Sequence, residues 1–357
     1  MAFCICHISA LEFWRSLSDF ERSRLYNAGA LKRTTIPPFG FSFQKESVNA
    51  EDVLSDTSCL ARSAPLGMSV AAEEICRDIH SFAGALRHPL HVLVSAGAYR
   101  RKGEDLRFHV HEGDYASGSF FRVGDIYVVS PELAFVQYAR DASLVDLLRV
   151  GAELTGSYAA LLRTPEEAEG ADVLGFRKGE LVTTLARLRA YVKRASREHG
   201  IKRARVALRY LPEGCASPME SVLFLLLSLP CAYGGYGLPR PEVNYRISVP
   251  DDRRGAMGRS CFICDLYWPQ ARLCVEYDSN MFHTGAQRIA RDSARRNALA
   301  LKGITVVSVT GNQIMDRVEM DRAAYLIAKK LGFRPSAYCG DFPERQAGLR
   351  TALLLSK

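Results

Sequence analysis

CFICDLYWPQARLCVEYD, residues 261–278, predicts two strands joined by a tight turn. Aromatic and aliphatic side chains dominate both arms, and Pro269 stands where a strand cannot continue. If the hairpin is symmetric about the Gln270–Ala271 bond, Asp265 lies directly across from Glu276 on one face, with side chains about 5 Å apart. The stretch therefore predicts an antiparallel pair that brings acids together.

Three carboxylates are expected to converge on this hairpin. Asp278 lies two residues after Glu276, and alternate side chains of a strand point to the same face. Like charges at such a short distance and partly shielded from water are unfavourable unless a proton or a cation lies between them. A bound divalent metal is one interpretation, and scattered acids at a wet sheet edge are the other. Spacing alone leaves both open.

The composition is that of a globular protein with a basic surplus. The chain has 357 residues, of which 48% are hydrophobic and 24% charged, enough for two or three domains. A formal net charge of +8 and an isoelectric point near 9.0 favour an acidic partner such as nucleic acid. The longest apolar run, Val222–Leu229, is too short to span a bilayer, and the N-terminus lacks a signal-peptide pattern. We therefore expect a cytoplasmic protein with no membrane partner.

Ten cysteines are scattered along the chain without a secretion signal, so reduced thiols are expected. Cys261 and Cys264 form a C-x-x-C motif, which invites a zinc interpretation. Positions three apart in a strand face opposite sides, however, and no second motif completes four ligands. Most cysteines are therefore interpreted as small core residues.

Residues 1–165 predict an α+β accessory domain. Ser9–Glu12 has the form of a capping box that opens a helix, and Ser130–Pro131 that of an N-cap followed by proline at the first helical position. The other predicted elements are a helix over residues 71–86 and strands over residues 90–94, 107–111 and 126–129.

Residues 166–212 are expected to form a basic helical connector. Leucines repeat at helical spacing across Gly179–Gly200, and the glycine at the end stands at the C-cap position. Seven basic residues and one acid follow between Lys193 and Arg209. Such a run is usually a solvated face, but between two modules it can also track phosphates. On the second interpretation, Arg203 and Arg205 contact DNA.

Residues 213–335 predict a mixed sheet flanked by helices, and residues 336–357 are assigned to a C-terminal tail. Ser217 and Glu220 form a capping box at the first helix. The predicted order is α-β-β-β-α-β-α, so the whole chain is assigned to the α/β (α+β) class. After the first helix, the elements are a strand over residues 243–247, the hairpin, a helix over 285–301, a strand over 304–309 and a helix over 315–331.

The acidic and basic residues of this domain resemble those of the DUF559 group. Its members are similar to very-short-patch-repair endonucleases and carry the PD-(D/E)xK restriction-endonuclease-like fold. The resemblance covers about residues 215–333, and residues 1–165 more loosely resemble AbiEi-type antitoxin proteins. The residues that carry the first resemblance are Asp265, Glu276, Asp278, His283, Arg288, Asp292 and Arg295.

The resemblance implies a catalytic metal site. Asp265 and Glu276 would hold Mg²⁺ or Mn²⁺, with Glu220 as a supporting acid in the same site. The ion would polarise a phosphodiester oxygen and lower the pKa of a water that attacks phosphorus. Many members of the family carry lysine where this chain has Asp278, so the charge-neutralising role of that lysine must fall to other groups in this chain. His283 is assigned to proton transfer or phosphate contact.

Arginines after the hairpin are the remaining candidates. Arg288, Arg291 and Arg295 share one helix face, where they would contact DNA, and Arg288 or Arg295 would stabilise the negative transition state. Ion pairs with Asp292 that merely steady the helix are the alternative. The function expected from the resemblance is a metal-dependent DNA endonuclease or nickase in phage defence or mobile-element biology, with a partner protein of a defence or toxin–antitoxin system. The alternative is a non-catalytic nucleic-acid-binding or antitoxin-like regulator that retains a nuclease fold.

Overall fold

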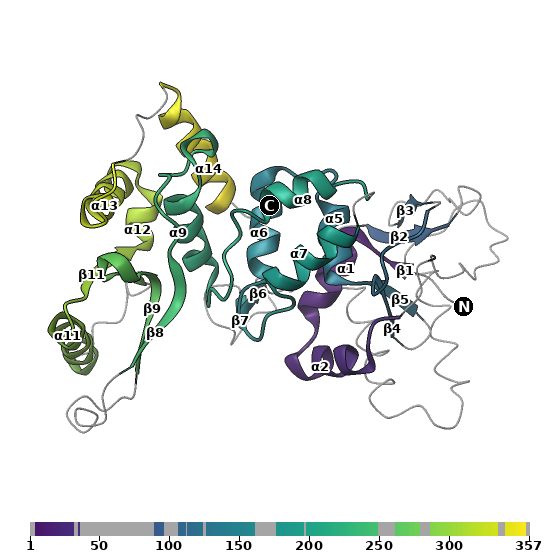
Figure 1. Cartoon of the computed structure of the whole chain (residues 1–357), viewed down its shortest axis with the longest axis horizontal. Helices are drawn as coiled ribbons and strands as arrows, with labels where there is room; N and C mark the ends of the chain where they lie inside the picture. The colour runs from purple at the N-terminus through teal and green to yellow at the C-terminus, as the bar shows by residue number, and fades with distance from the viewer. Residues whose placement is uncertain are drawn as a thin grey trace. The chain divides into compact units, whose positions relative to one another are not determined.

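The chain forms two compact units, Met1–Arg209 and Tyr210–Lys357. Both combine helices with sheets, which confirms the predicted α/β class (Figure 1). Within the described ranges, no helix is both long and apolar enough to cross a membrane. The computed structural model describes residues 4–31, 35, 89–95, 106–111, 113–123, 126–160, 176–195, 198–248, 261–278, 286–334 and 340–354.

Unit 1 contains a mixed five-stranded sheet in the order β3-β2-β1-β5-β4. β1 runs parallel to β5 and antiparallel to β2, β2 runs parallel to β3, and β4 runs antiparallel to β5. The three predicted strands correspond to β2, β3 and β5, while the helix predicted over residues 71–86 lies outside the described residues. The strands are β1 (Cys4–Ile5), β2 (Leu90–Val94), β3 (Leu106–Val110), β4 (Phe120–Val123) and β5 (Ile126–Val129).

Helix α1 begins at His7, so the capping box predicted at Ser9 is wrong. The Ser9 hydroxyl instead donates to the Pro89 carbonyl and accepts from the His91 N–H, which joins the helix to β2. The N-cap predicted at Ser130, before Pro131, is confirmed at α5, since Ser130 accepts a hydrogen bond from the Leu133 N–H. The helices and small strands of unit 1 are α1 (His7–Ser16), α2 (Asp19–Ala28), α5 (Pro131–Tyr138), α6 (Leu144–Leu154), β6 (Tyr158–Ala160), β7 (Phe176–Lys178), α7 (Leu185–Arg194) and α8 (Ile201–Ala207).

The predicted connector is part of unit 1 rather than a separate segment. In place of one helix ending at Gly200, α7 begins after Thr184 and ends at Arg194, and Gly200 is the N-cap of α8 with a left-handed φ of 90°. α7 packs on α5 and α8 on α6. A Cβ at Gly200 would lie 2.2 Å from the Val136 carbonyl oxygen, so the glycine allows the start of α8 to approach α5 closely.

Unit 2 contains a four-stranded mixed sheet in the order β11-β10-β9-β8. β8, β9 and β10 are antiparallel neighbours, and β10 is joined through α11 to the parallel strand β11, which confirms the predicted order. The elements are α9 (Pro218–Ser228), η4 (Cys231–Tyr233), β8 (Glu242–Ser248), β9 (Cys261–Trp268), η6 (Pro269–Ala271), β10 (Leu273–Asp278), α11 (Ala286–Leu301), β11 (Thr305–Thr310), α12 (Gly311–Met315), α13 (Arg317–Lys330) and α14 (Phe342–Leu354).

One prediction for the end of unit 2 is confirmed and another is wrong. The helix predicted over residues 315–331 is α13, which Asp316 caps by accepting the Glu319 N–H at 2.9 Å, while the short helix α12 before it was not predicted. The segment assigned to a tail forms α14, which packs on α9 and buries Phe342 and Leu349. Burial of these large side chains makes the C-terminal helix part of the unit's core.

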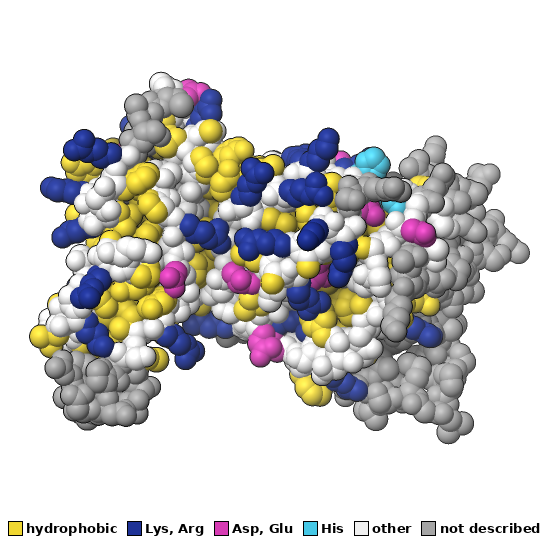
Figure 2. Space-filling view, in the orientation of Figure 1, with side chains coloured by type: hydrophobic (Ala, Val, Ile, Leu, Met, Phe, Trp, Pro, Cys, Tyr) yellow, Lys and Arg dark blue, Asp and Glu magenta, His cyan; other side chains and the backbone are white. Residues whose placement is uncertain are grey.

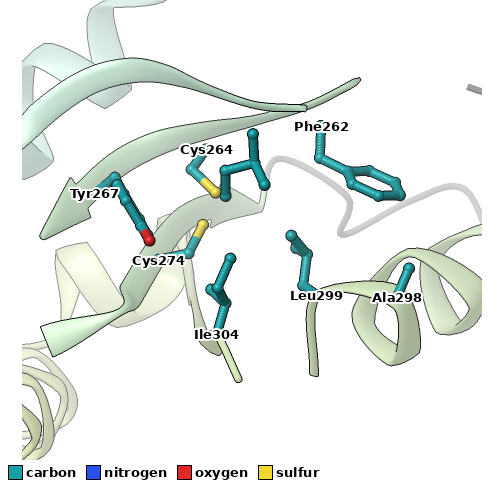
Figure 3. Close-up of a cluster of buried hydrophobic side chains, with 8 residues drawn as sticks. Phe262, Cys264, Tyr267, Cys274, Ala298, Leu299 and Ile304 are labelled. Atoms are coloured by element: carbon teal, nitrogen blue, oxygen red, sulfur yellow. The ribbon is translucent and has the colours of Figure 1, made fainter. Parts of the chain in front are cut away.

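One face of this sheet is covered by α11. Ala298 and Leu299 of α11 pack against side chains of β9 and β10, including Cys264 and Cys274, whose sulfur atoms face each other (Figure 3). Side chains alternate along a strand, so Val275 points away from this cluster. Val275 is nevertheless fully buried, and α9 contacts β9 and β10, so α9 covers the face opposite α11. The functional candidates lie where these layers meet.

Candidate carboxylate site and basic groove

The hairpin has the predicted register. Cys274 pairs with Tyr267 and Val275 with Leu266, as symmetry about the Gln270–Ala271 bond requires. The pairing of β9 with β10 ends there, and beyond it the Tyr277 N–H donates to Oδ2 of Asp265 at 2.8 Å. The Asp265 carboxylate thus takes the place of a backbone acceptor between β9 and β10.

Strand β9 is irregular at Asp265. Its pairing with β8 skips Asp265 and Asn244, and Asn244 has a left-handed φ of 47°. Cys264 and Tyr267 lie three residues apart, yet both belong to the cluster of Figure 3, whereas regular alternation would place them on opposite faces. The alternation that predicted a shared face for Asp265 and Glu276 therefore does not hold at Asp265.

Glu220 is held at the start of α9. Ser217 Oγ accepts the Glu220 N–H at 3.2 Å, which confirms the N-cap, but Glu220 Oε2 accepts the N–H of Ala216 at 2.7 Å instead of that of Ser217, so the predicted capping box is only half formed. Asn244 Nδ2 also donates to Glu220 Oε2 at 3.4 Å, so the irregular position of β8 faces this acid. Asn244 was not predicted as a site residue from the sequence. An asparagine inside an otherwise β-forming run is the signal that could have indicated it.

Asp265 is electrostatically coupled to both other acids. Burial, followed by the negative charges of Glu220 and Glu276, raises the pKa of Asp265 to about 7, although the hydrogen bond from Tyr277 and the charge of Arg295 oppose this shift. Glu220, Asp265 and Glu276 lie on α9, β9 and β10, the helix and strands on which the sequence predicted them. The pKa of Asp265 therefore depends on the charges of Glu220 and Glu276.

Glu276 has a cationic partner. Arg295 of α11 places Nη2 2.5 Å from Glu276 Oε1, and the same nitrogen donates to the Ile263 carbonyl of β9. The Cys274 thiol donates to the same carboxylate oxygen at 3.4 Å. Both members of the ion pair are mostly buried, with side-chain exposures of 29% for Arg295 and 17% for Glu276. Arg295, which was predicted to contact DNA, is here tied to the sheet.

The carboxylates do not form a closed ligand set. In the described part of the chain, three His, Cys, Asp or Glu ligand atoms lie within 4.8 Å of one another at two places. One is the Cys264, Cys274 and Glu276 group, and the other comprises three histidines of unit 1. The acids Glu220, Asp265 and Glu276 are not such a group. Their oxygen donors suit Mg²⁺ or Mn²⁺, but a shared ion would require their side chains to move closer together.

The remaining predicted site residues of unit 2 lie on α11, at the end of β10 or outside the described residues. His283 lies outside the described residues, and Arg288 and Arg291 belong to α11 although their side chains are not described. Asp278 ends β10, where it pairs with Thr310 of β11. Burial and the charge of Asp278 raise the pKa of Tyr277, so Asp278 adds negative charge at this end of the strand.

A basic groove lies between α7 and α8 in unit 1. Lys and Arg side chains gather over these helices, as Figure 2 shows. The groove has a volume of about 460 Å³, and its lining residues are Arg189, Val192, Lys193, Arg205, Leu208 and Arg209.

The structure separates the two predicted DNA contacts of this segment. Arg205 lines the groove and donates one long hydrogen bond, of 3.5 Å, to the Val192 carbonyl, whereas Arg203 donates to the Arg140 carbonyl at 3.2 Å and to the Ala142 carbonyl in the segment after α5. Arg189, which the sequence analysis did not single out, also lines the groove. Its spacing of four residues from Lys193 is the signal that places both on one face of α7.

Two known proteins are similar to part of this chain. Both are uncharacterized proteins of Mycobacterium tuberculosis, from strains CDC 1551 / Oshkosh and ATCC 25618 / H37Rv. Each is 33% identical over 132 residues, which cover 37% of this chain and 43% of the relative. The chain thus spans less than half the length of these relatives. No protein-family model matches the chain, and no solved structure matches it significantly.

Proposed function

We propose that unit 2 is a metal-dependent nuclease that cuts or nicks DNA. The observation that carries this proposal is the partly buried Asp265 carboxylate, which lies within electrostatic reach of Glu220 and Glu276. Repulsion among partly buried acids is relieved by a proton or by a cation, and oxygen donors favour hard divalent ions. The cap at Glu220, the hydrogen bond to Asp265 and the ion pair of Glu276 account for each acid singly, but not for the repulsion among them.

Asp265, Glu220 and Glu276 would hold Mg²⁺ or Mn²⁺, and the bound ion would polarise a phosphodiester oxygen and acidify a water. Asn244 and Ser217 orient Glu220, while the Tyr277 N–H orients Asp265. Arg295 holds Glu276 and supplies a positive charge where many members of the family that the chain resembles rely on lysine. The chain's own residues thus position the acids and offset their negative charge.

DNA is the proposed substrate. The groove between α7 and α8 presents several cationic side chains on one surface, which suits a phosphate backbone. A cytoplasmic location and a partner protein from a defence or toxin–antitoxin system complete the proposal. The location accords with the globular composition of the chain, and the partner protein rests on the sequence resemblance.

A non-catalytic nucleic-acid-binding or antitoxin-like regulator is the second candidate. The observation that favours it is the ion pair of Glu276 with Arg295, which occupies an acid that the metal would need. In that case the groove would bind nucleic acid while the carboxylates served only the fold of unit 2.

Nicking of supercoiled plasmid separates the two candidates. The nuclease proposal expects nicked circles with Mg²⁺ or Mn²⁺, and none when EDTA is present. DNA binding measured in EDTA by fluorescence anisotropy should persist in either case. Binding without nicking under any of these ions would support the regulator and contradict the nuclease.

A further inference from the structure

Three histidines of unit 1 lie together although they are far apart in the sequence. His7 begins α1 just after β1, His91 lies on β2, and His109 lies on β3. Because these three strands are neighbours in the sheet, one ring nitrogen of each histidine comes within 4.8 Å of the others. His91 Nδ1 and His109 Nε2 are 2.9 Å apart and share a hydrogen bond.

His7 has an unfavourable backbone conformation and an unfavourably buried ring. Its φ of 57° is left-handed, a conformation that residues other than glycine adopt rarely and at a cost in free energy. Its side chain is buried, and among the described residues neither ring nitrogen has a hydrogen-bond partner. Buried polar atoms without a partner are destabilising, so such a ring calls for a ligand.

We propose that His7, His91 and His109 form a binding site for a divalent transition-metal ion of the Zn²⁺ type. Imidazole nitrogen is a preferred donor for such ions, and three histidines leave a fourth coordination position open. This site is separate in sequence and in chemistry from the carboxylates of unit 2, which offer oxygen donors. It would join the start of α1 to β2 and β3.

The surroundings of the cluster suit this ion. Asp141 Oδ2 lies 3.8 Å from His7 Nε2 and is 67% exposed, so it can provide the fourth ligand or orient a bound water. Burial lowers the pKa of both His7 and His109 to about 4, which leaves their imidazoles neutral at pH 7. Only a deprotonated ring nitrogen can bind a metal.

Metal binding requires the rings to turn. His7 and His109 are stacked, with centroids 4.6 Å apart and planes 13° apart. A ring nitrogen binds an ion in the plane of its own ring, so two nearly parallel rings cannot share one ion without rotating. The hydrogen bond between His91 and His109 would also be replaced by two bonds to the metal. Stacking of neutral rings without a metal is therefore the competing explanation.

Co²⁺ titration of the full chain tests the site, because Co²⁺ in a histidine site absorbs visible light. In the wild type, a visible absorption band should grow until one equivalent of Co²⁺ has been added, without the near-ultraviolet charge-transfer absorption of a thiolate ligand. His7→Asn keeps a residue that tolerates a left-handed φ, and it should abolish this band. His109→Gln should do the same, with circular dichroism confirming that both variants are folded.

Two control variants define the outcome. His199→Gln changes an exposed histidine of the same unit and should leave the band unchanged. Cys264→Ser should also leave it unchanged, which separates the site from the Cys264, Cys274 and Glu276 group. Absence of the band in the wild type, or its retention in folded His7→Asn, would overturn the proposal. Neither result depends on nuclease activity.

Discussion

Arg295 Nη2 lies 2.5 Å from Glu276 Oε1, so the helix that follows the hairpin is tied to the acid that the hairpin carries. The same nitrogen also reaches the Ile263 carbonyl on the adjacent strand. This contact gives Arg295 a role that the helix-face pattern of arginines did not reveal. It also places a positive charge inside a group of carboxylates.

Replacement of Arg295 by methionine should destabilise unit 2. The change removes the cationic partner of a mostly buried carboxylate, so the free energy of unfolding should fall by about 1–3 kcal/mol. Urea denaturation measures this loss. Arg296→Met changes the next, exposed residue of α11 and should have little effect. Equal losses in the two variants would mean that the ion pair contributes nothing specific.

The stability of unit 2 should depend on the protonation of Asp265. Its pKa of about 7 in the folded chain exceeds the ordinary 3.8, so the folded state binds the proton more tightly than the unfolded state does. The contribution of the Asp265 proton to the free energy of unfolding is fully present below about pH 4, and it is lost as the pH rises through about 7. Asp265→Asn should remove this dependence and stabilise the chain at pH 8 by on the order of 2 kcal/mol.

Denaturation in EDTA at pH 5 and pH 8 checks this prediction. The difference in unfolding free energy between the two pH values should be larger for the wild type than for Asp265→Asn. An identical pH dependence in both proteins would show that Asp265 does not titrate in this range.

Arg205 and Arg203 should respond differently to substitution. Arg205→Glu should weaken DNA binding and reduce the slope of log affinity against log salt by about one or more, because it reverses a charge in the groove. Arg203→Ala should instead lower the unfolding free energy by about 1–2 kcal/mol, because its guanidinium donates to two carbonyls. Anisotropy titrations over a salt series, paired with urea denaturation, measure both effects. A larger loss of affinity in a folded Arg203→Ala would reverse this assignment.

Gly200 should tolerate a methyl group less well than Gly214. Both have a left-handed φ, so alanine costs about 1 kcal/mol at each. At Gly200 the added Cβ also meets the Val136 carbonyl, whereas nothing lies within 4 Å at Gly214. Gly200→Ala should therefore be about 2 kcal/mol more destabilising in thermal or urea unfolding. Similar losses would contradict the close approach of α8 to α5.

Local patterns predicted much of unit 2. Pro269 placed the turn, the turn set the pairing of Val275 with Leu266, and Ser217 started α9 as expected. These features depend on neighbouring residues, so a sequence displays them directly. The class of fold followed from the order of such elements.

Features that depend on distant residues were not predictable in the same way. The irregularity at Asp265 is shared with Asn244 of another strand, and the partner of Glu276 comes from α11. His7, His91 and His109 come together only because three strands are neighbours in the sheet. The basic segment was read as a connector because its charges are visible in sequence, while its packing on α5 and α6 is not.

The initial rate of plasmid nicking in Mg²⁺ or Mn²⁺ tests the proposed function most directly, when wild type, Asp265→Asn, Glu276→Gln and Glu242→Gln are purified identically. Glu242 is an exposed acid of β8 and serves as the matched control. Loss of one metal ligand should reduce the rate at least about 100-fold in the first two variants, a barrier increase of roughly 2.7 kcal/mol. The control should match the wild type. Equal residual rates in all four proteins, or no metal-dependent nicking by the wild type, would contradict a nuclease built on Asp265 and Glu276.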